Sequence, residues 1–152
     1  MFSELQRVGK KLIIWGGNFF LDQLGRATCM IVWDKKRRGM SQADCEIAWT
    51  NLLDQSRVFE FTWNGFLQEN MKEKETRIHA TQKPVDLYRF CFNKAKTSIG
   101  DIVFDPYLGS GSSRIAAYDA GLNFIGCEID PVYFAKEEER FARHTKQISL
   151  WE

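Results

Sequence analysis

GDIVFDPYLGSGSSRIAAYDAG, residues 100–121, is the stretch that decides the fold. An apolar segment at 102–106 is followed by a turn of small residues and by a helix-like segment, 112–120, that ends at Gly121. A strand, a glycine turn and a helix in this order often bind a ligand, because the first turn of the helix presents unpaired N–H groups. The stretch therefore predicts a nucleotide-like ligand at the turn.

The segments around this stretch predict a mixed α/β protein. Further strands are expected at 11–15, 28–33 and 123–128, further helices at 84–95 and 131–145, and an antiparallel hairpin of 45–50 with 57–63. Thr81 is expected to cap the helix that has Pro84 in its first turn. We therefore expect a Rossmann-like sheet flanked by helices, with an antiparallel hairpin, in a single domain of residues 1–152.

Composition limits the classes of function. The chain has 152 residues, of which 44% are apolar, and a net charge of +1, so any surface for nucleic acid must be local rather than global. No apolar segment is long enough to span a membrane, and an intracellular protein is expected. We expect no metal site, and we expect buried free thiols at Cys29, Cys45, Cys91 and Cys127, which lie far apart within apolar stretches.

The residues of the turn favour S-adenosylmethionine as the ligand. Gly109, Ser110 and Gly111 let the backbone approach a ligand closely, and Glu128 follows on the next strand, where a carboxylate can accept both hydrogens of a ribose diol. No lysine follows the glycines, and Asp105 adds a negative charge that disfavours phosphate. The alternative is that the glycines serve only tight strand–turn–helix packing.

Several motifs together resemble the DNA amino-methyltransferases that modify adenine N6 or cytosine N4. DPYLGSGSS is similar to the first motif of that family, GCEIDPVYF to the second, and HATQKPVDLYRF (79–90) to the motif that precedes them in phage-type members with a C-terminal cofactor half. LIIWGGNFF and MIVWDKK are similar to segments that follow the catalytic motif. The resemblance extends over about residues 3–145, and it implies S-adenosylmethionine as cofactor and double-stranded DNA as partner.

The resemblance assigns cofactor contacts to the part of the chain at about 79–145. The acid and the glycine turn would hold the methionine end, Glu128 the ribose, Ile129 and Tyr133 the adenine, and residues 81–84 the amino-acid carboxylate. A lysine at a helix start also favours a carboxylate on physical grounds, although a solvated Lys83 is the alternative. The implied cofactor-binding residues are Asp105, Pro106, Gly109, Ser110, Gly111, Glu128, Ile129, Tyr133, Thr81, Gln82, Lys83 and Pro84.

The catalytic motif of the resembling family is absent from the sequence. No Asp/Asn/Ser-Pro-Pro-aromatic tetrapeptide occurs, so the catalytic residues are unknown. The family fold also places the strand of that motif between those near 102–106 and 11–15, and its absence would leave two unpaired strand edges. We expect that another polypeptide or protomer supplies this strand, that the chain is the C-terminal portion of a longer protein, or that the sheet is rearranged.

A DNA-facing part is expected at about 34–78. Lys35, Lys36, Arg37 and Arg38 form the densest basic cluster and suit phosphate contacts, with a solvated loop as the alternative. Trp63, Asn64 and Phe66 occupy the position of target recognition in the resembling family, and Trp15 is a candidate for the base pocket or the core.

The sequence thus predicts an S-adenosylmethionine-dependent, site-specific DNA methyltransferase of the restriction-modification kind. Adenine N6 is favoured as the target on the family branch alone. The expected location is the cytoplasm of a bacterium or of a phage-infected host cell. Little or no activity is expected of this chain in isolation. One alternative is a catalytically degenerate, methyltransferase-like binding or partner subunit, and another is an RNA or small-molecule methyltransferase with a catalytic motif of a different type.

Overall fold

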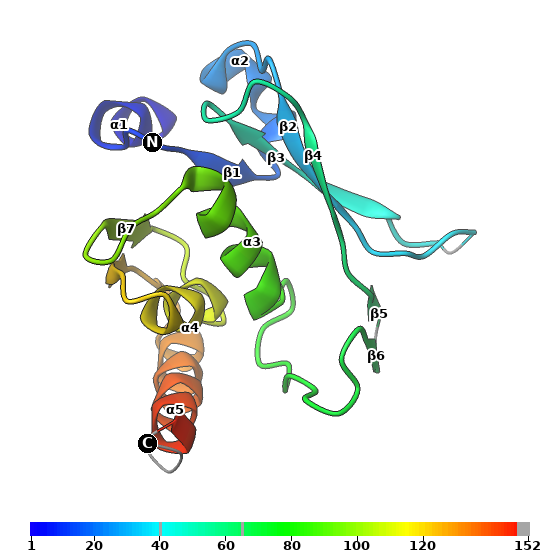
Figure 1. Cartoon of the computed structure of the whole chain (residues 1–152), viewed down its shortest axis with the longest axis vertical. Coiled ribbons are helices and arrows are strands. Elements are labelled where there is room, and N and C mark those ends of the chain that lie inside the picture. Colours follow the sequence, from blue (N-terminus) through cyan, green and yellow to red (C-terminus); the bar gives the residue numbers. More distant parts are fainter. Residues whose placement is uncertain (40, 65, 149–152) are drawn as a thin grey trace. The chain divides into compact units, whose positions relative to one another are not determined.

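The computed structural model describes residues 1–39, 41–64 and 66–148, without the side chains of residues 147 and 148. The chain forms two compact units, Met1–Lys74 and Glu75–Glu152 (Figure 1). Both units combine helices with strands, in agreement with the predicted α/β class, whereas the single domain of residues 1–152 stays a prediction. Among the described helices, none is both long and apolar enough to cross a membrane.

The first unit is built on a four-stranded mixed sheet. Its strands lie in the order β1 (Ile13–Trp15), β3 (Cys45–Thr50), β2 (Met30–Asp34) and β4 (Arg57–Glu60). β3 pairs antiparallel with β1 and with β2, whereas β4 runs parallel to β2. Burial alternates along β2, so that Ile31 and Trp33 are almost wholly buried on one face.

The predicted antiparallel hairpin of 45–50 with 57–63 is wrong. β3 takes β2 as its antiparallel neighbour, and β4 lies on the other edge of β2 and parallel to it. Alternation of apolar and polar residues indicates a strand and its inward face, but it does not indicate the partner. The apolar strand β2 has a partner on each edge. The antiparallel pair therefore consists of β2 and β3 instead of β3 and β4.

Two small helices and a 3-10 turn pack against this sheet. They are α1 (Phe2–Val8), η1 (Gly17–Phe19) and α2 (Leu21–Leu24). Phe2, Leu24 and Trp49 form the buried cluster between these helices and β3. Gly25 has a φ of 81°, a backbone conformation that glycine adopts without strain, and it ends α2.

The charged segment after β4 contains a very short antiparallel pair, β5 (Trp63–Asn64) and β6 (Leu67–Gln68). Phe59, Phe61 and Trp63 lie in a row, with ring centroids 5.4 Å apart for the first pair and 6.5 Å for the second. The three aromatic rings therefore pack along one line through β4 and β5. The remainder of the segment up to α3 has little regular structure.

The second unit has the predicted βαβα order. It consists of α3 (Val85–Ala95), β7 (Ile102–Asp105), α4 (Ser112–Asp119), β8 (Asn123–Gly126) and α5 (Pro131–Ile148). β7 and β8 pair in parallel, and the connection through α4 is the βαβ unit that such pairing requires. The apolar faces of the helices meet in a core of Val85, Ile115 and Ala116, with Tyr88, Phe92 and Phe141 packed around it.

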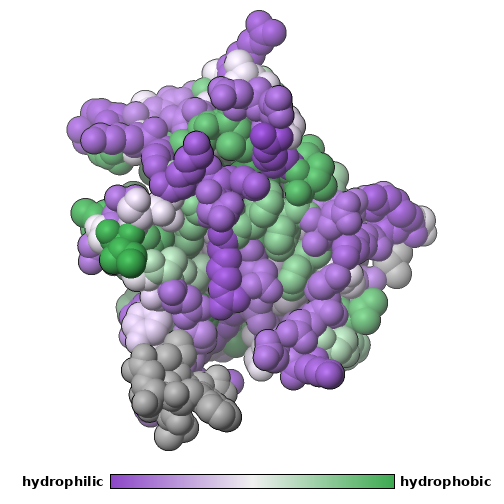
Figure 2. Space-filling model, in the orientation of Figure 1, coloured by the Kyte–Doolittle hydropathy of each residue, from purple (hydrophilic) through white to green (hydrophobic). Residues whose placement is uncertain are grey.

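One face of the β7–β8 sheet is apolar and exposed. Ile102 is 69% exposed, Phe104 46% and Ile125 54%. Figure 2 shows hydrophobic side chains at the molecular surface among hydrophilic ones. Cys127, just after β8, is also exposed, which contradicts the expectation of four buried thiols; Cys29 and Cys91 are buried and Cys45 is partly buried. The expectation fails at Cys127 because the apolar stretch around it faces outward in part.

Both strands that the resemblance places beside the missing one end a sheet. In the described residues β7 pairs only with β8, and β1 pairs only with β3. Each therefore has an outer edge without a partner strand among those residues. This is the local arrangement that the absence of a neighbouring strand would leave.

Candidate cofactor site

The turn after β7 depends on two glycines with left-handed backbone conformations. Gly109 has a φ of 55° and Gly111 a φ of 71°, and Gly111 stands directly before the first residue of α4. The N–H of Leu108 donates to the carbonyl of Cys127, which fixes the turn to the strand end of β8. This geometry brings the start of α4 to the carboxyl end of the sheet, where α/β proteins bind ligands.

Gly111 is required by packing as well as by its φ. A Cβ on Gly111 would lie 2.8 Å from Cδ of Glu137 and closer still to other atoms of that side chain. Glu137 is fully buried on α5 and forms an ion pair with Arg114 of α4 at 2.9 Å. Burial raises the pKa of Glu137 above its ordinary value, while Arg114 opposes that effect.

Glu128 lies directly against the glycine turn. Its Oε2 accepts a hydrogen bond from the N–H of Gly109 at 2.8 Å, and its Oε1 accepts one from the N–H of Asp130 at 2.9 Å. The hydrogen bond from Asp130, with those from Gly109 and Ile129, holds the pKa of Glu128 below its ordinary value. The carboxylate is therefore ionised at neutral pH and keeps lone pairs that can accept further hydrogen bonds.

Asp105 is held in one orientation at the end of β7. Its Oδ1 accepts the N–H of Tyr107 at 3.0 Å, and its Oδ2 accepts the hydroxyl of Ser113 at 2.6 Å. Pro106 follows and is partly buried. The structure therefore places Asp105, the two glycines and Glu128 around one turn, as the sequence predicts, although their roles stay predictions.

The residues predicted to close over the carboxylate surround the start of α3. Gln82 is buried, its Oε1 accepting the N–H of Ile78 and its Nε2 donating to the carbonyl of Thr76. The carbonyl of Lys83 accepts the hydroxyl of Ser112, 2.7 Å away. This bond joins the start of α3 to the start of α4.

Thr81 does not cap α3, which corrects the prediction. Its hydroxyl lies 3.1 Å from Nδ1 of His79, and the buried Pro84 occupies the residue before the helix. The first N–H of the helix, that of Val85, donates instead to Oε1 of Glu75 at 2.9 Å. A carboxylate ten positions upstream in a loop leaves no local signal, so the sequence could not indicate this cap.

The two residues predicted to border the adenine differ in environment. Ile129 is almost fully exposed, and Tyr133 is partly buried with its ring centroid 4.2 Å from that of His79. His79 is thus a packing residue beside the turn. An exposed apolar side chain and an aromatic ring are residue types that suit a planar apolar ligand.

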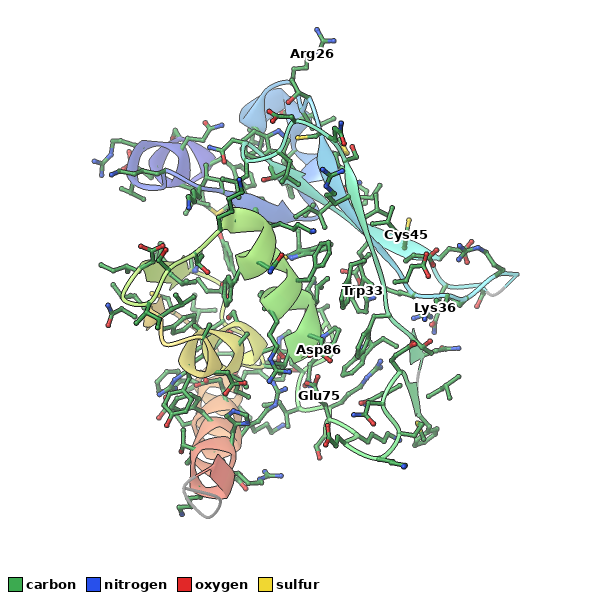
Figure 3. All side chains as sticks on the ribbon, in the orientation of Figure 1. Arg26, Trp33, Lys36, Cys45, Glu75 and Asp86 are labelled. Carbon is green, nitrogen blue, oxygen red and sulfur yellow. The ribbon has the colours of Figure 1, made fainter. Side chains whose placement is uncertain are left out.

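The candidate DNA-facing cations are all engaged within the first unit. Lys35 pairs with Glu46 at 2.7 Å and Lys36 with Glu69 at 2.7 Å, while Arg38 pairs with Asp34 at 2.6 Å. Arg37 is buried and donates to the carbonyl of Trp63 at 2.7 Å. Figure 3 labels Lys36 in the loop after β2, near Trp33 and Cys45.

The target-recognition candidates lie in and after β5, where the carbonyl of Trp63 accepts from Arg37. Asn64 is partly buried in β5, and Phe66 is 88% exposed. Trp15 is partly buried in β1. Phosphate contacts by the cluster of Lys35 to Arg38 would have to exchange with its internal pairs, and the role of these residues stays a prediction.

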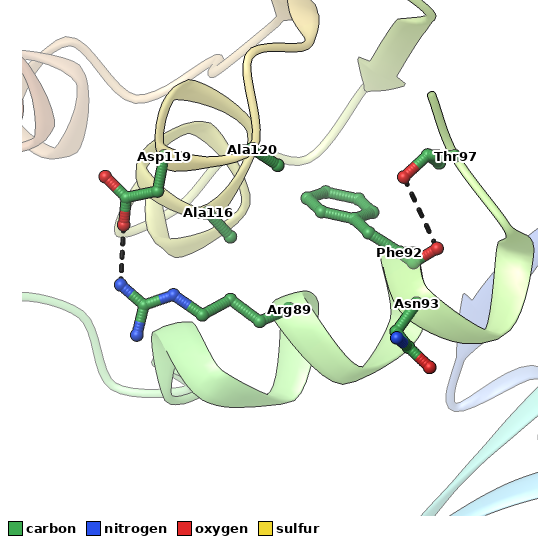
Figure 4. Close-up of a pocket in the computed structure, with 7 residues that line it drawn as sticks. All are labelled: Arg89, Phe92, Asn93, Thr97, Ala116, Asp119 and Ala120. Atoms are coloured by element: carbon green, nitrogen blue, oxygen red, sulfur yellow. Dashed lines mark hydrogen bonds and ion pairs between the residues drawn. The ribbon is translucent and has the colours of Figure 1, made fainter. Parts of the chain in front are cut away.

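A cavity of about 290 Å³ lies away from the glycine turn (Figure 4). It opens between α3 and α4, and the ion pair between Arg89 and Asp119, at 2.5 Å, forms one side of it. None of the predicted cofactor residues lines this cavity. Its lining consists of Arg89, Phe92, Asn93, Thr97, Ala116, Asp119 and Ala120.

Sequence reasoning missed four charged residues beneath the turn. Glu137 and Arg140 of α5, Arg114 of α4 and Glu75 before α3 form ion pairs that are wholly or largely buried. Charged residues on a helix usually indicate a solvated face. The spacing of Glu137, Arg140 and Phe141 on one side of α5 is the signal that could have identified an inward face.

Sequence comparisons place the chain among DNA methylases. A sequence model of a DNA methylase family matches residues 28–139. The chain is 32% identical over 93 residues to the type II methyltransferase M.HinfI of Haemophilus influenzae, covering 58% of this chain and 25% of that protein. It is 28% identical over 114 residues to M2.DpnII of Streptococcus pneumoniae, covering 75% and 42%. The chain therefore spans less than half the length of these curated relatives, and their bacterial origin gives no support to a phage source.

Solved structures agree on the fold. The crystal structure of the M1.HpyAVI–SAM complex superposes with a TM-score of 0.63 at 21% identity, covering 91% of this chain and 79% of that one. The cytosine-N4-specific PvuII DNA methyltransferase superposes with a TM-score of 0.60 at 13% identity, covering 84% and 58%. With the family match over most of the chain, these findings show that the protein belongs to the N6/N4 DNA methylase family.

Proposed function

We propose that this chain is the cofactor-binding and DNA-facing part of a site-specific DNA methyltransferase, with adenine N6 favoured as the target. The observation that carries the proposal is the turn after β7, where Gly109 donates to the ionised Glu128. Structural neighbours include complexes with S-adenosylmethionine, and this supports the same cofactor here. The proposed location is the cytoplasm of a bacterium.

The residues of the turn suit S-adenosylmethionine better than a dinucleotide. Two carboxylates, Asp105 and Glu128, lie at the turn, and they favour a ligand with ammonium and sulfonium charges over one with phosphates. Glu128 would accept the ribose hydroxyls, and Tyr133 and Ile129 would border the adenine. Thr81, Gln82, Lys83 and Pro84 would close over the carboxylate, with Asp105, Pro106 and residues 109–111 at the methionine end.

The cofactor would supply a methyl group on a sulfonium sulfur. The S–CH3 bond breaks as an N–CH3 bond forms on the exocyclic amino nitrogen, the S–C electron pair stays on sulfur, and one amino proton leaves to an acceptor. This chain's residues would contribute by orientation and electrostatics, because Glu128 and Asp105 fix the donor while residues 34–78 face a flipped base. No residue of this chain is proposed as the proton acceptor, and the catalytic residues stay unknown because the sequence has no Asp-Pro-Pro-aromatic motif.

The missing motif supports a further part of the proposal. The catalytic strand would come from a second polypeptide or protomer, or from another part of a longer protein, because β7 has no partner strand on its outer edge among the described residues. The alternative function is a catalytically degenerate binding subunit, favoured by the same missing motif. We expect no transfer of labelled methyl groups to DNA by this chain alone, and measurable transfer would contradict that expectation.

Calorimetric titration with S-adenosylmethionine tests the cofactor site. We expect the wild-type chain to bind the cofactor and Glu128→Ala to bind about tenfold more weakly or worse, because the variant loses the acceptor of the ribose hydroxyls. A tenfold change corresponds to about 1.4 kcal/mol of binding free energy. Glu139→Ala, which changes an exposed carboxylate on α5, is the matched control and should bind like the wild type. No binding by the wild-type chain would contradict the cofactor site and favour the degenerate subunit.

A further inference from the structure

Arg140 of α5 reaches under the glycine turn. One terminal nitrogen, Nη1, donates to the carbonyl of Ser110 at 2.6 Å and to the hydroxyl of Ser112 at 2.9 Å. The other, Nη2, donates to Oε2 of Glu75 at 2.5 Å. Only 11% of the Arg140 side chain is exposed, so these bonds are largely shielded from water. The guanidinium thus binds the backbone of the glycine turn through the carbonyl of Ser110.

Glu75 connects the same guanidinium to the start of α3. While its Oε2 accepts from Arg140, its Oε1 accepts the first N–H of the helix, that of Val85. The side chain is 20% exposed, and Figure 3 labels it beside the start of α3, near Asp86. One carboxylate therefore caps α3 and binds the residue that supports the glycine turn.

Ser112 closes the arrangement on the third side. Its hydroxyl donates to the carbonyl of Lys83 and accepts from Arg140, which uses the one proton and a lone pair of a hydroxyl. The start of α3, the glycine turn and α5 are thereby joined by charge-assisted hydrogen bonds. We call Arg140 and Glu75 the clasp.

The clasp is a device for geometry more than for stability. Transferring two charges out of water costs most of what their attraction returns, so a buried ion pair adds little net stability. What it fixes is orientation, because a guanidinium donates in a rigid planar fork. Here the fork points at the backbone of the turn and at the carboxylate that caps α3.

We propose that Arg140 and Glu75 are positioning residues that hold the two walls of the methionine end of the cofactor site in register. One wall is the turn of residues 109–111, and the other is the start of α3 with residues 81–84. The inference rests on the proposed function, because it assigns that end of the site to the amino-acid part of S-adenosylmethionine. Neither side chain needs to touch the cofactor: Arg140 acts through the Ser110 carbonyl and Glu75 through the Val85 N–H.

Binding of two ligands distinguishes a positioning role of Arg140 at the methionine end from a general loss of order in the site. S-adenosylhomocysteine carries the amino-acid part, whereas methylthioadenosine lacks it and would contact only the Glu128, Ile129 and Tyr133 side of the site. We expect Arg140→Met to weaken binding of S-adenosylhomocysteine about tenfold and to leave binding of methylthioadenosine within about twofold. Arg143→Met, which removes a half-exposed arginine from the same helix, should change neither. Equal weakening of both ligands, or of neither, would overturn the proposal.

A double-mutant cycle tests whether the pair acts as a unit. Glu75→Gln should weaken S-adenosylhomocysteine binding by a similar factor, and the double variant with Arg140→Met should be little worse than either single variant. Arg140→Lys keeps the charge and a single donor nitrogen without the planar fork, and it should restore part of the affinity. It also replaces Arg140→Met if that variant fails to fold. Additive losses would contradict the clasp.

Amide hydrogen exchange of the ligand-free chain separates this inference from the proposed function. Arg140→Met should speed exchange at residues 109–113 and at Val85, and leave β8 unchanged. If the wild-type chain binds no S-adenosylhomocysteine, the proposed function fails, and the exchange pattern still decides whether the clasp holds the turn. Unchanged exchange at both places would overturn the clasp itself.

Discussion

Gly111 is more constrained than Gly109, although both adopt left-handed conformations. A side chain at Gly109 would meet only the ring of His79 at 3.7 Å, which is ordinary contact. At Gly111 it would collide with Glu137, and that carboxylate is fully buried and held by Arg114. The first glycine is therefore required by its backbone alone, and the second by its backbone and by packing.

Alanine substitutions should show this difference. We expect Gly109→Ala to cost about 1 kcal/mol of unfolding free energy from backbone strain, and Gly111→Ala about 2–4 kcal/mol because overpacking adds to the strain. Urea unfolding of both variants measures the costs. Gly100→Ala is the control, since Gly100 has a φ of 87° and open space around it. Equal losses at Gly109 and Gly111 would show that Glu137 moves aside freely.

At the residue scale the sequence predicted the residues at the glycine turn itself. Glycines before a helix and an acid on the next strand are local patterns, and Glu128 does lie against Gly109. The residues that support the turn were not predictable in this way. Arg140 and Glu75 are far apart in the chain, and each alone is typical of a solvated surface; only tertiary packing makes them partners.

The element scale explains why strand pairing was harder to predict than strand existence. The strand segments were located within a few residues, but β4 pairs with β2 rather than β3. In the second unit, by contrast, the order βαβα allows little choice, because parallel neighbours joined by a helix follow from the connection itself. The part of the fold that holds the candidate site was thus the more predictable one.

Ion pairs attach the loop after β2 to its surroundings, and they should make the first unit sensitive to acid. Arg38 and Lys36 hold the pKa of Asp34 at about 2, and Lys36 and Thr62 hold that of Glu69 at about 2. The unfolded values are 3.8 and 4.5, so at intermediate pH the unfolded state binds more protons. The stabilisation is present above about pH 4.5 and is lost as the pH falls toward 2.

Glu69→Gln should reduce this acid sensitivity. We expect the variant to lose less stability than the wild type between pH 6 and pH 3, by under about 1 kcal/mol because the pair is partly exposed. Urea midpoints followed by tryptophan fluorescence measure the loss. Glu73→Gln removes an exposed carboxylate that contacts Asn70, and it should behave like the wild type. Identical pH profiles for Glu69→Gln and the wild type would contradict this role for Glu69.

At the scale of the whole molecule, the apolar face of the β7–β8 sheet is the feature with the largest expected effect on solution behaviour. Exposed Ile102, Phe104 and Ile125 form a surface of the kind that binds hydrophobic dyes and promotes association. The double variant Ile102→Thr with Ile125→Thr should bind less anilinonaphthalene sulfonate and unfold at about the same urea concentration. Val103→Thr, on the opposite and partly buried face, should instead lower stability. Unchanged dye binding in the double variant would place the apolar surface elsewhere.

The sequence separation between paired strands differs between the two units, and this difference affects the order in which the units fold. In the first unit Ile13 must find Thr50, with β2 and its loops between them, whereas β7 and β8 are joined by one turn and one short helix. Chains dominated by distant pairings fold more slowly, because loop closure must precede the contacts that reward it. The second unit should therefore reach its native form first on refolding. Its glycine turn would then form before β1 pairs with β3.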